Sequence, residues 1–309
     1  MEQRQTVSLV LGSGGARGHA HIGVIRAVEE RGYLIRNIAG TSMGALIGGV
    51  YAAGALDGYT EWAYRLERGD VLRLLDVSFS RRSLFKGERV FDVLRELLGE
   101  RQIEDLDRGF VAVATALNEQ KEVWLNRGAL FGAIRASSAV PGVFAPVMHE
   151  RRMLVDGGLV NPIPIAPTLM DTTDATIAVN LNALGGGRRV AKRRAREAPA
   201  PGEENGYRER IAQWFREQFA GGDTPASEES LSAVDLLSKS FDTMQGAIAR
   251  MKLATYAPTT IVEVPRRACG FFEFHRAREL AQVGYVAAND ALDRLQERVA
   301  ARDEPPQAG

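Results

Sequence analysis

The chain begins with apolar runs of strand length that alternate with longer segments of helical periodicity. Residues 6–11 are rich in β-forming side chains and end at glycines, and residues 20–31 carry apolar side chains at helical spacing. Residues 35–39 and 44–55 repeat this order of strand and helix. Such alternation is typical of a parallel sheet whose right-handed crossovers place helices on both faces. We therefore predict an α/β fold with a mostly parallel central sheet.

The rest of the chain adds further strand-forming runs and helical patterns. The strand-forming runs are residues 110–117, 122–125, 175–181 and 260–264, of which the first two favour a hairpin or edge pair. The helical patterns are residues 90–98, 230–254 and 276–301. We expect a single domain over residues 1–301 and a disordered tail over residues 302–309.

The composition changes between residues 184 and 229, where glycines lead into a basic run and then into Pro- and Glu-rich sequence. Low complexity and mixed charge predict a partly mobile insertion within the domain. Residues 188–219 combine the basic run with an aromatic helical face, which is typical of an interfacial helix on an anionic lipid surface. The alternative is that this face packs on the body of the protein or on a second subunit of a homo-oligomer, with the basic run a solvated loop.

Composition and charge exclude several classes of protein. Residues 37–56 are uncharged and long enough to cross a bilayer, but their glycines and strand–turn–helix pattern favour a buried unit. The 39 basic and 39 acidic residues cancel, which argues against a nucleic-acid partner. The lone Cys269 excludes an intrachain disulfide and a multi-cysteine zinc site. No secretory signal is visible, so we expect a cytoplasmic protein, with peripheral contact at the inner membrane as an option.

The segment Gly40-Thr41-Ser42-Met43-Gly44 is a G-x-S-x-G motif at a predicted junction of strand and helix. A nucleophilic serine on such an elbow sits in a strained turn that needs glycines on both sides. The positive end of the following helix favours an oxyanion beside Ser42. Ser42 is therefore a candidate nucleophile, and a plain turn with an incidental serine is the alternative.

A glycine loop, Gly12-Ser13-Gly14-Gly15-Ala16-Arg17-Gly18, lies between the first predicted strand and helix. It fails the dinucleotide-binding fingerprint, because Arg17 stands where the third glycine is required, and it lacks the ending of a P-loop. Such a loop either forms a simple tight turn or aims backbone N–H groups at a developing oxyanion. In the second case Gly14 and Gly15 are the donors, and Arg17 braces the loop or contacts a substrate phosphate.

The third candidate motif is Asp156-Gly157-Gly158, which by itself is equally consistent with a hairpin turn. If Ser42 is a nucleophile, it needs a base. Only His275 would complete the chain order Ser, acid, His of an α/β-hydrolase triad, and its surroundings favour a surface or capping role. The remaining option is a dyad in which Asp156 accepts the Ser42 proton, which requires burial to raise the pKa of the carboxyl from about 3.9.

Together these motifs resemble the patatin-like phospholipase family, specifically its bacterial branch similar to the neuropathy target esterase catalytic domain. The resemblance rests on GSGGARGHAHIGV, GTSMGALIGG, ASSAVPGVFAPV and DGGLVNPIP, in this order. It implies a three-layer patatin-like sandwich, a Ser42–Asp156 dyad, an oxyanion hole of Gly14 and Gly15, and neither metal nor cofactor. The supporting motif residues are Gly12, Arg17, Gly18, Gly40, Gly44, Gly157 and Gly158. One departure is Ser13, where many patatins have glycine.

The resemblance also implies a serine lipid acyl hydrolase that cleaves phospholipid or lysophospholipid esters through an acyl-enzyme, an intermediate equally open to acyl transfer. Two alternatives are an esterase with a Ser42–Asp156–His275 triad and a low-turnover, membrane-associated interaction protein. Several apolar residues either line an acyl channel or belong only to the core. They are Leu84, Phe85, Phe91, Val140, Phe144 and Leu159.

Overall fold

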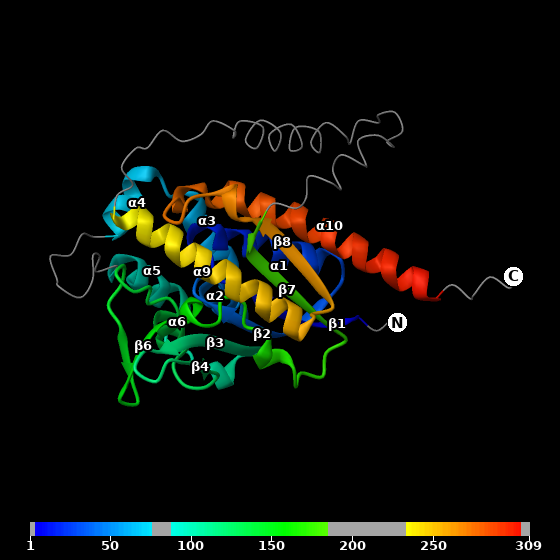
Figure 1. Ribbon diagram of the computed structural model, residues 1–309, viewed down its shortest axis with the longest axis horizontal. Helices are drawn as coiled ribbons and strands as arrows, with labels where there is room; N and C mark the ends of the chain where they lie inside the picture. Colours follow the sequence, from blue (N-terminus) through cyan, green and yellow to red (C-terminus); the bar gives the residue numbers. More distant parts are fainter. Residues whose placement is uncertain (1–3, 76–87, 185–232, 304–309) are drawn as a thin grey trace, which may run out of the picture. The chain divides into compact units, whose positions relative to one another are not determined.

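The computed structural model describes residues 4–75, 88–184 and 233–303 (Figure 1). Residues up to Leu184 and from Ser240 onward form one compact unit, and the site described below lies within it. Residues 185–239 form a second unit, of which only the first turns of one helix are described. The predicted insertion from residue 185 on and its interfacial helix, together with Leu84 and Phe85, thus lie outside the described residues.

The described strands form one mixed sheet with the order β5-β6-β3-β2-β1-β7-β8, and β4 pairs with β3. Their bounds are β1 (Thr6–Leu11), β2 (Leu34–Thr41), β3 (Gly109–Ala116), β4 (Lys121–Leu125), β5 (Val147–His149), β6 (Arg152–Asp156), β7 (Ala175–Ala183) and β8 (Thr260–Pro265). Strands β3, β2, β1, β7 and β8 are parallel, whereas β4, β5 and β6 add antiparallel pairs. The predicted mostly parallel α/β sheet is confirmed.

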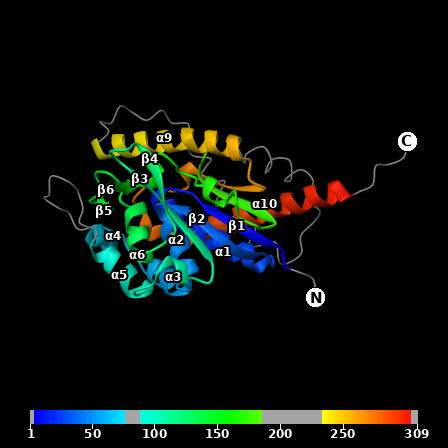
Figure 2. The ribbon, with the colours of Figure 1, turned by 90° about the horizontal axis from the view of Figure 1, so that it is seen from below.

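Helices cover both faces of this sheet (Figures 1 and 2). Their bounds are α1 (Ala20–Glu30), α2 (Met43–Ala52), α3 (Leu56–Tyr64), α4 (Arg68–Leu75), α5 (Glu88–Leu98), α6 (Leu130–Ser137), α9 (Ala233–Tyr256) and α10 (Ala277–Asp303). Ala249 of α9 packs on Val10 and Ala178 on one face. On the other face, Gly48 of α2 lies against the Leu11 side chain. Successive residues of β1 thus serve opposite faces, as the pleat of a strand requires.

The apolar stretch at residues 37–56 forms the end of β2, the buried helix α2 and the start of α3. In the described part of the chain, no helix has the length and apolarity needed to cross a membrane. The sequence patterns did not single out α3, α4 or α6 as helices, nor the short hairpin formed by β5 and β6. The predicted tail begins inside α10, which runs to Asp303.

Strands β2 and β6 share one edge of β3, and this arrangement brings the ends of both strands together. Thr41 at the end of β2 pairs in parallel with Val113, and Asp156 at the end of β6 pairs in antiparallel fashion with Ala114. The opposite edge of β3 is taken by β4, which pairs along residues 112–116. Because β2 and β6 run toward each other, their last residues meet at neighbouring rungs of β3.

Candidate active site

Ser42 occupies the turn between β2 and α2 in a backbone conformation that L-amino acids rarely adopt. Its φ is 58° and its ψ is −124°, and only 4% of the residue is exposed. A side chain at Gly40 would overlap the backbone of Gly44 and Ala45, and one at Gly44 would overlap the Leu11 carbonyl. The glycines of the G-x-S-x-G segment therefore permit the close crossing that holds Ser42 in this elbow.

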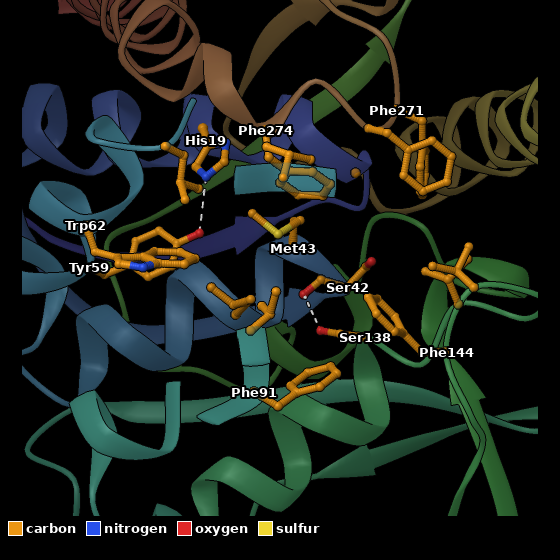
Figure 3. A pocket seen from close by; sticks show the side chains of 18 residues that line it. His19, Ser42, Met43, Tyr59, Trp62, Phe91, Ser138, Phe144, Phe271 and Phe274 are labelled. Atoms are coloured by element: carbon orange, nitrogen blue, oxygen red, sulfur yellow. Dashed lines mark hydrogen bonds between the residues drawn. The ribbon is translucent and has the colours of Figure 1, made fainter. Parts of the chain in front are cut away.

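Two serines that the sequence patterns did not single out fix the backbone of Ser42. The Ser42 N–H donates to Ser137 Oγ at 3.0 Å, and Ser137 Oγ donates to the Val113 carbonyl at 2.6 Å. Ser138 Oγ donates to the Ser42 carbonyl at 3.3 Å (Figure 3). Ser137 is the last residue of α6, and Ser138 follows it. Their only signal in the sequence is their place in the ASSAVPGVFAPV segment.

Asp156 is fully buried, and its two carboxylate oxygens have different surroundings. Oδ1 accepts the Gly158 N–H at 2.7 Å, whereas Oδ2 has no hydrogen-bond partner among the described residues. Burial raises the pKa of Asp156 to about 7, although the Ser42 side chain and the Gly158 amide both favour the charged form. A carboxyl in this state gains and releases a proton near neutral pH, as a general base requires.

The glycine loop leaves two backbone amides unused beside the elbow. Ser13 N–H donates to the Pro162 carbonyl at 2.8 Å, and Ala16 N–H donates to the Phe271 carbonyl at 2.9 Å. Neither Gly14 nor Gly15 donates its N–H to another of the described residues. Gly15 has a φ of +57°, and it lines the same pocket as Ser42.

Arg17 is 1% exposed, and its guanidinium is used within the fold. Nε donates to the Gly14 carbonyl at 3.0 Å, Nη1 to the Arg266 carbonyl at 3.0 Å, and Nη2 to Asp242 Oδ1 at 2.6 Å. Arg17 was expected either to brace the glycine loop or to contact a substrate phosphate. These contacts match the first role, because each of the three guanidinium nitrogens donates to a group of the fold.

The histidines near the site are buried and neutral. His19 Nδ1 donates to the Ala16 carbonyl, since a carbonyl can only accept, and Nε2 then accepts from the Tyr59 hydroxyl at 3.1 Å (Figure 3). His21 Nε2 donates to the Gly12 carbonyl at 2.8 Å. Burial lowers the pKa of both imidazoles to about 4.

His275 lies in a 3-10 turn (Phe274–Arg276) and makes no hydrogen bond to Asp156, whose oxygens contact Gly158 or nothing among the described residues. A Ser-Asp-His triad needs an acid–imidazole hydrogen bond, so these contacts do not assemble one. In the described part of the chain there is also no cluster of three side chains suited to a metal ion.

An apolar pocket opens beside Ser42 (Figure 3). Its walls are mainly aliphatic and aromatic side chains, including Phe91, Val140 and Phe144 from the expected channel set, whereas Leu159 is not among them. The remaining lining residues are Gly15, His19, Met43, Leu46, Tyr59, Trp62, Leu66, Val71, Val90, Ser138, Val143, Phe271, Phe272 and Phe274. Ser42 therefore faces a cavity suited to a hydrocarbon chain.

Comparison with known proteins gives one consistent family. The family model described as patatin-like phospholipase matches residues 9–169, just over half of the chain. An NTE family protein of Mycobacterium tuberculosis, itself uncharacterised, is 39% identical over 93% of this chain and 91% of its own length. A lysophospholipase of Emericella nidulans, nte1, is 33% identical over 58% of this chain and 12% of its own length.

Among solved structures, VipD from Legionella pneumophila is similar in fold, with a TM-score of 0.53 and 14% sequence identity. The similarity covers 94% of this chain and 67% of that chain.

Proposed function

The chain belongs to the patatin-like phospholipase family, and from this premise we propose that it is a serine lipid acyl hydrolase acting on carboxylic esters of phospholipids or lysophospholipids. The observation that carries the proposal is that Thr41, the residue before Ser42, and Asp156 pair with adjacent residues of β3, and that Ser42 lines an apolar pocket. The Emericella relative is named a lysophospholipase, which adds support for a lysophospholipid substrate.

The proposed reaction needs only the groups at this site. Asp156 accepts the Ser42 hydroxyl proton while Ser42 Oγ attacks the ester carbonyl carbon, and the negative charge develops on the carbonyl oxygen. The unused Gly14 and Gly15 amides stabilise that oxygen, and each such donor typically contributes about 3 to 4 kcal/mol. Asp156 then donates the proton to the departing alcohol, which leaves an acyl-enzyme.

Water completes the cycle in the second half of the reaction. Asp156 accepts a proton from water as the hydroxide attacks the acyl-enzyme, and the proton returns to Ser42 Oγ as the fatty acid leaves. A pKa near 7 suits both directions of transfer, because the carboxyl is ready to accept and to donate around neutral pH. The apolar pocket holds the acyl chain throughout.

Fluorophosphonate labelling and lipid product analysis test this proposal. We expect Ser42→Ala to abolish labelling, and Asp156→Asn to lower the turnover number by a factor on the order of 10² to 10⁴, the usual contribution of a positioned base. The exposed Asp57→Asn, on α3, is the matched control and should behave as the parent protein. Parent-level turnover in Ser42→Ala would refute Ser42 as the nucleophile. Loss of activity in the single variant His275→Ala would favour the Ser42–Asp156–His275 triad.

A further inference from the structure

The glycine loop at residues 12–18, which is the oxyanion loop of the proposed reaction, is held by side chains that lie far beyond it in the sequence. Two of them, Asp242 and Gln245, stand three residues apart on α9 and therefore on one face of that helix. Asp242 Oδ1 accepts from Arg17 Nη2 at 2.6 Å, and Gln245 Nε2 donates to Ser13 Oγ at 2.9 Å. Helix α9 thus contacts the loop on both sides of Gly14 and Gly15.

Both contacts are shielded from water, which makes them effective restraints. Gln245 is fully buried, Ser13 is 1% exposed, and the Asp242 side chain is 14% exposed. Arg17 passes the restraint on, because its Nε donates to the Gly14 carbonyl, the peptide unit that carries the Gly15 N–H. A displaced Arg17 would therefore rotate the amide of Gly15, a residue that lines the pocket.

Within the described residues, the Ser13 hydroxyl makes its hydrogen bond with Gln245. It accepts from Gln245 Nε2 at 2.9 Å, and Ser13 directly precedes the two glycines of the loop. Gly158 packs against the same group, since a side chain there would meet Gln245 Nε2, Ser13 Oγ and Asp156 Oδ1. The tether thus lies next to Asp156 as well as the oxyanion loop.

From this geometry we propose that Asp242 and Gln245 of α9 are positioning residues that set the direction of the Gly14 and Gly15 amides. The proposal rests on the proposed function. It extends the machinery of the site beyond the family segment at residues 9–169 to two residues of α9 that lie more than 70 positions further along the chain. Neither side chain touches the reacting atoms; both act through Arg17 and Ser13.

The test compares Asp242→Asn and Gln245→Met with the matched control Asp293→Asn. Asp293 also forms an ion pair with an arginine, Arg31, at 2.7 Å, but between α10 and the end of α1. We expect the two α9 variants to lower kcat at least about tenfold with KM changed less than about twofold, since small displacements of catalytic groups are costly. The control should retain parent kcat and KM.

A binding measurement separates positioning from general damage to the fold. An alkyl trifluoromethyl ketone forms a tetrahedral oxyanion on Ser42, whereas an ether analogue of a lysophospholipid binds without one. The α9 variants should bind the ketone at least about tenfold more weakly and the ether lipid as the parent does. Equal weakening of both ligands, or kinetics like those of Asp293→Asn, would overturn the proposal.

Ser13→Ala removes one oxygen atom and tests the same tether if a larger change prevents folding. We expect it to lower kcat in the same direction as Gln245→Met, and the double variant to be no worse than the more affected single variant. Additive losses would contradict a shared contact. Absence of Ser42-dependent turnover in the parent protein would instead refute the proposed function itself.

Discussion

At the scale of single residues, Asp156 has an environment that is unfavourable for a charged carboxylate. Burial raises the pKa of this carboxyl to about 7, while Oδ2 lacks a hydrogen-bond partner among the described residues. A buried charged group without full solvation destabilises the folded state. The same environment raises the basicity of the carboxylate, as the proposed role of Asp156 as a general base requires.

The raised pKa predicts the pH dependence of activity. Asp156 must be deprotonated to accept the Ser42 proton, so kcat/KM should rise with pH through a midpoint near 7 and then level off. His19 and His21, with pKa values of about 4, stay neutral across this range. A pH–rate profile for a soluble short-chain ester checks this, and a flat profile between pH 5 and 8 would contradict Asp156 as the base.

The same shift predicts an effect on stability. The pKa of Asp156 is higher in the folded state than in the unfolded chain, so the folded state holds an extra proton between about pH 4 and 7. Its contribution to the free energy of unfolding therefore decreases as the pH rises through that window. We expect the free energy of unfolding of Asp156→Asn to exceed that of the parent by on the order of a few kcal/mol at pH 8. The difference should be smaller at pH 5. Urea unfolding at both pH values measures the difference.

At the scale of elements, contact between α1 and α10 depends on two glycines. A side chain at Gly23 would overlap the Ala281 carbonyl, and one at Gly284 would overlap the Ala20 carbonyl. The two helices thus cross with backbone against backbone. Since α1 continues directly from the turn that contains Arg17, this crossing also supports the glycine loop.

We expect Gly284→Ala to destabilise the protein by about 1 to 3 kcal/mol, because the helices must move apart to admit a methyl group. Gly246→Ala on α9 is the matched control, since a side chain there meets only the end of Arg250 at 3.5 Å. The control should be unchanged or more stable by up to about 1 kcal/mol, the helix preference of alanine over glycine. Equal unfolding free energies for the two variants would refute the close crossing.

The helices and strands also show which parts of this fold can be predicted from the sequence. The β–α–β–α start, the hairpin of β3 and β4 and the long α10 follow from periodicity, which is a local property. The β5–β6 hairpin is short, and its placement on β3 depends on pairing with a strand some 40 residues earlier. Similarly, Asp242 and Gln245 contact residues more than 200 positions away, so no local pattern marks them.

At the scale of the whole compact unit, the pocket beside Ser42 is built from distant parts of the chain. Helices α2 and α3 supply Leu46 and Trp62, and the segment before α10 supplies Phe271, Phe272 and Phe274. Figure 3 shows Ser42 and Trp62 at different sides of this cavity. Under the proposed function, the acyl chain occupies this cavity, so the side chains that border it should set which chain lengths fit.

Filling this space should change chain-length preference without removing the chemistry. We expect Leu46→Trp to lower kcat/KM for a long-chain ester about tenfold while a short-chain ester changes less than about threefold. Leu169→Trp, at a position 56% exposed, is the control and should affect neither ester. A loss shared equally by both esters would argue that Leu46 does not border the acyl chain.

The register of β6 on the shared edge of β3 decides which of its side chains stands opposite Ala114. Side chains alternate along a strand, so sliding β6 by one rung would bring Val155, an inert side chain, to the position opposite Ala114 that Asp156 now occupies. The proposed activity therefore depends on the alignment of β6 with β3. A variant with intact helices and strands but a slipped β5–β6 hairpin would have the circular dichroism spectrum of a folded protein and would still be inactive.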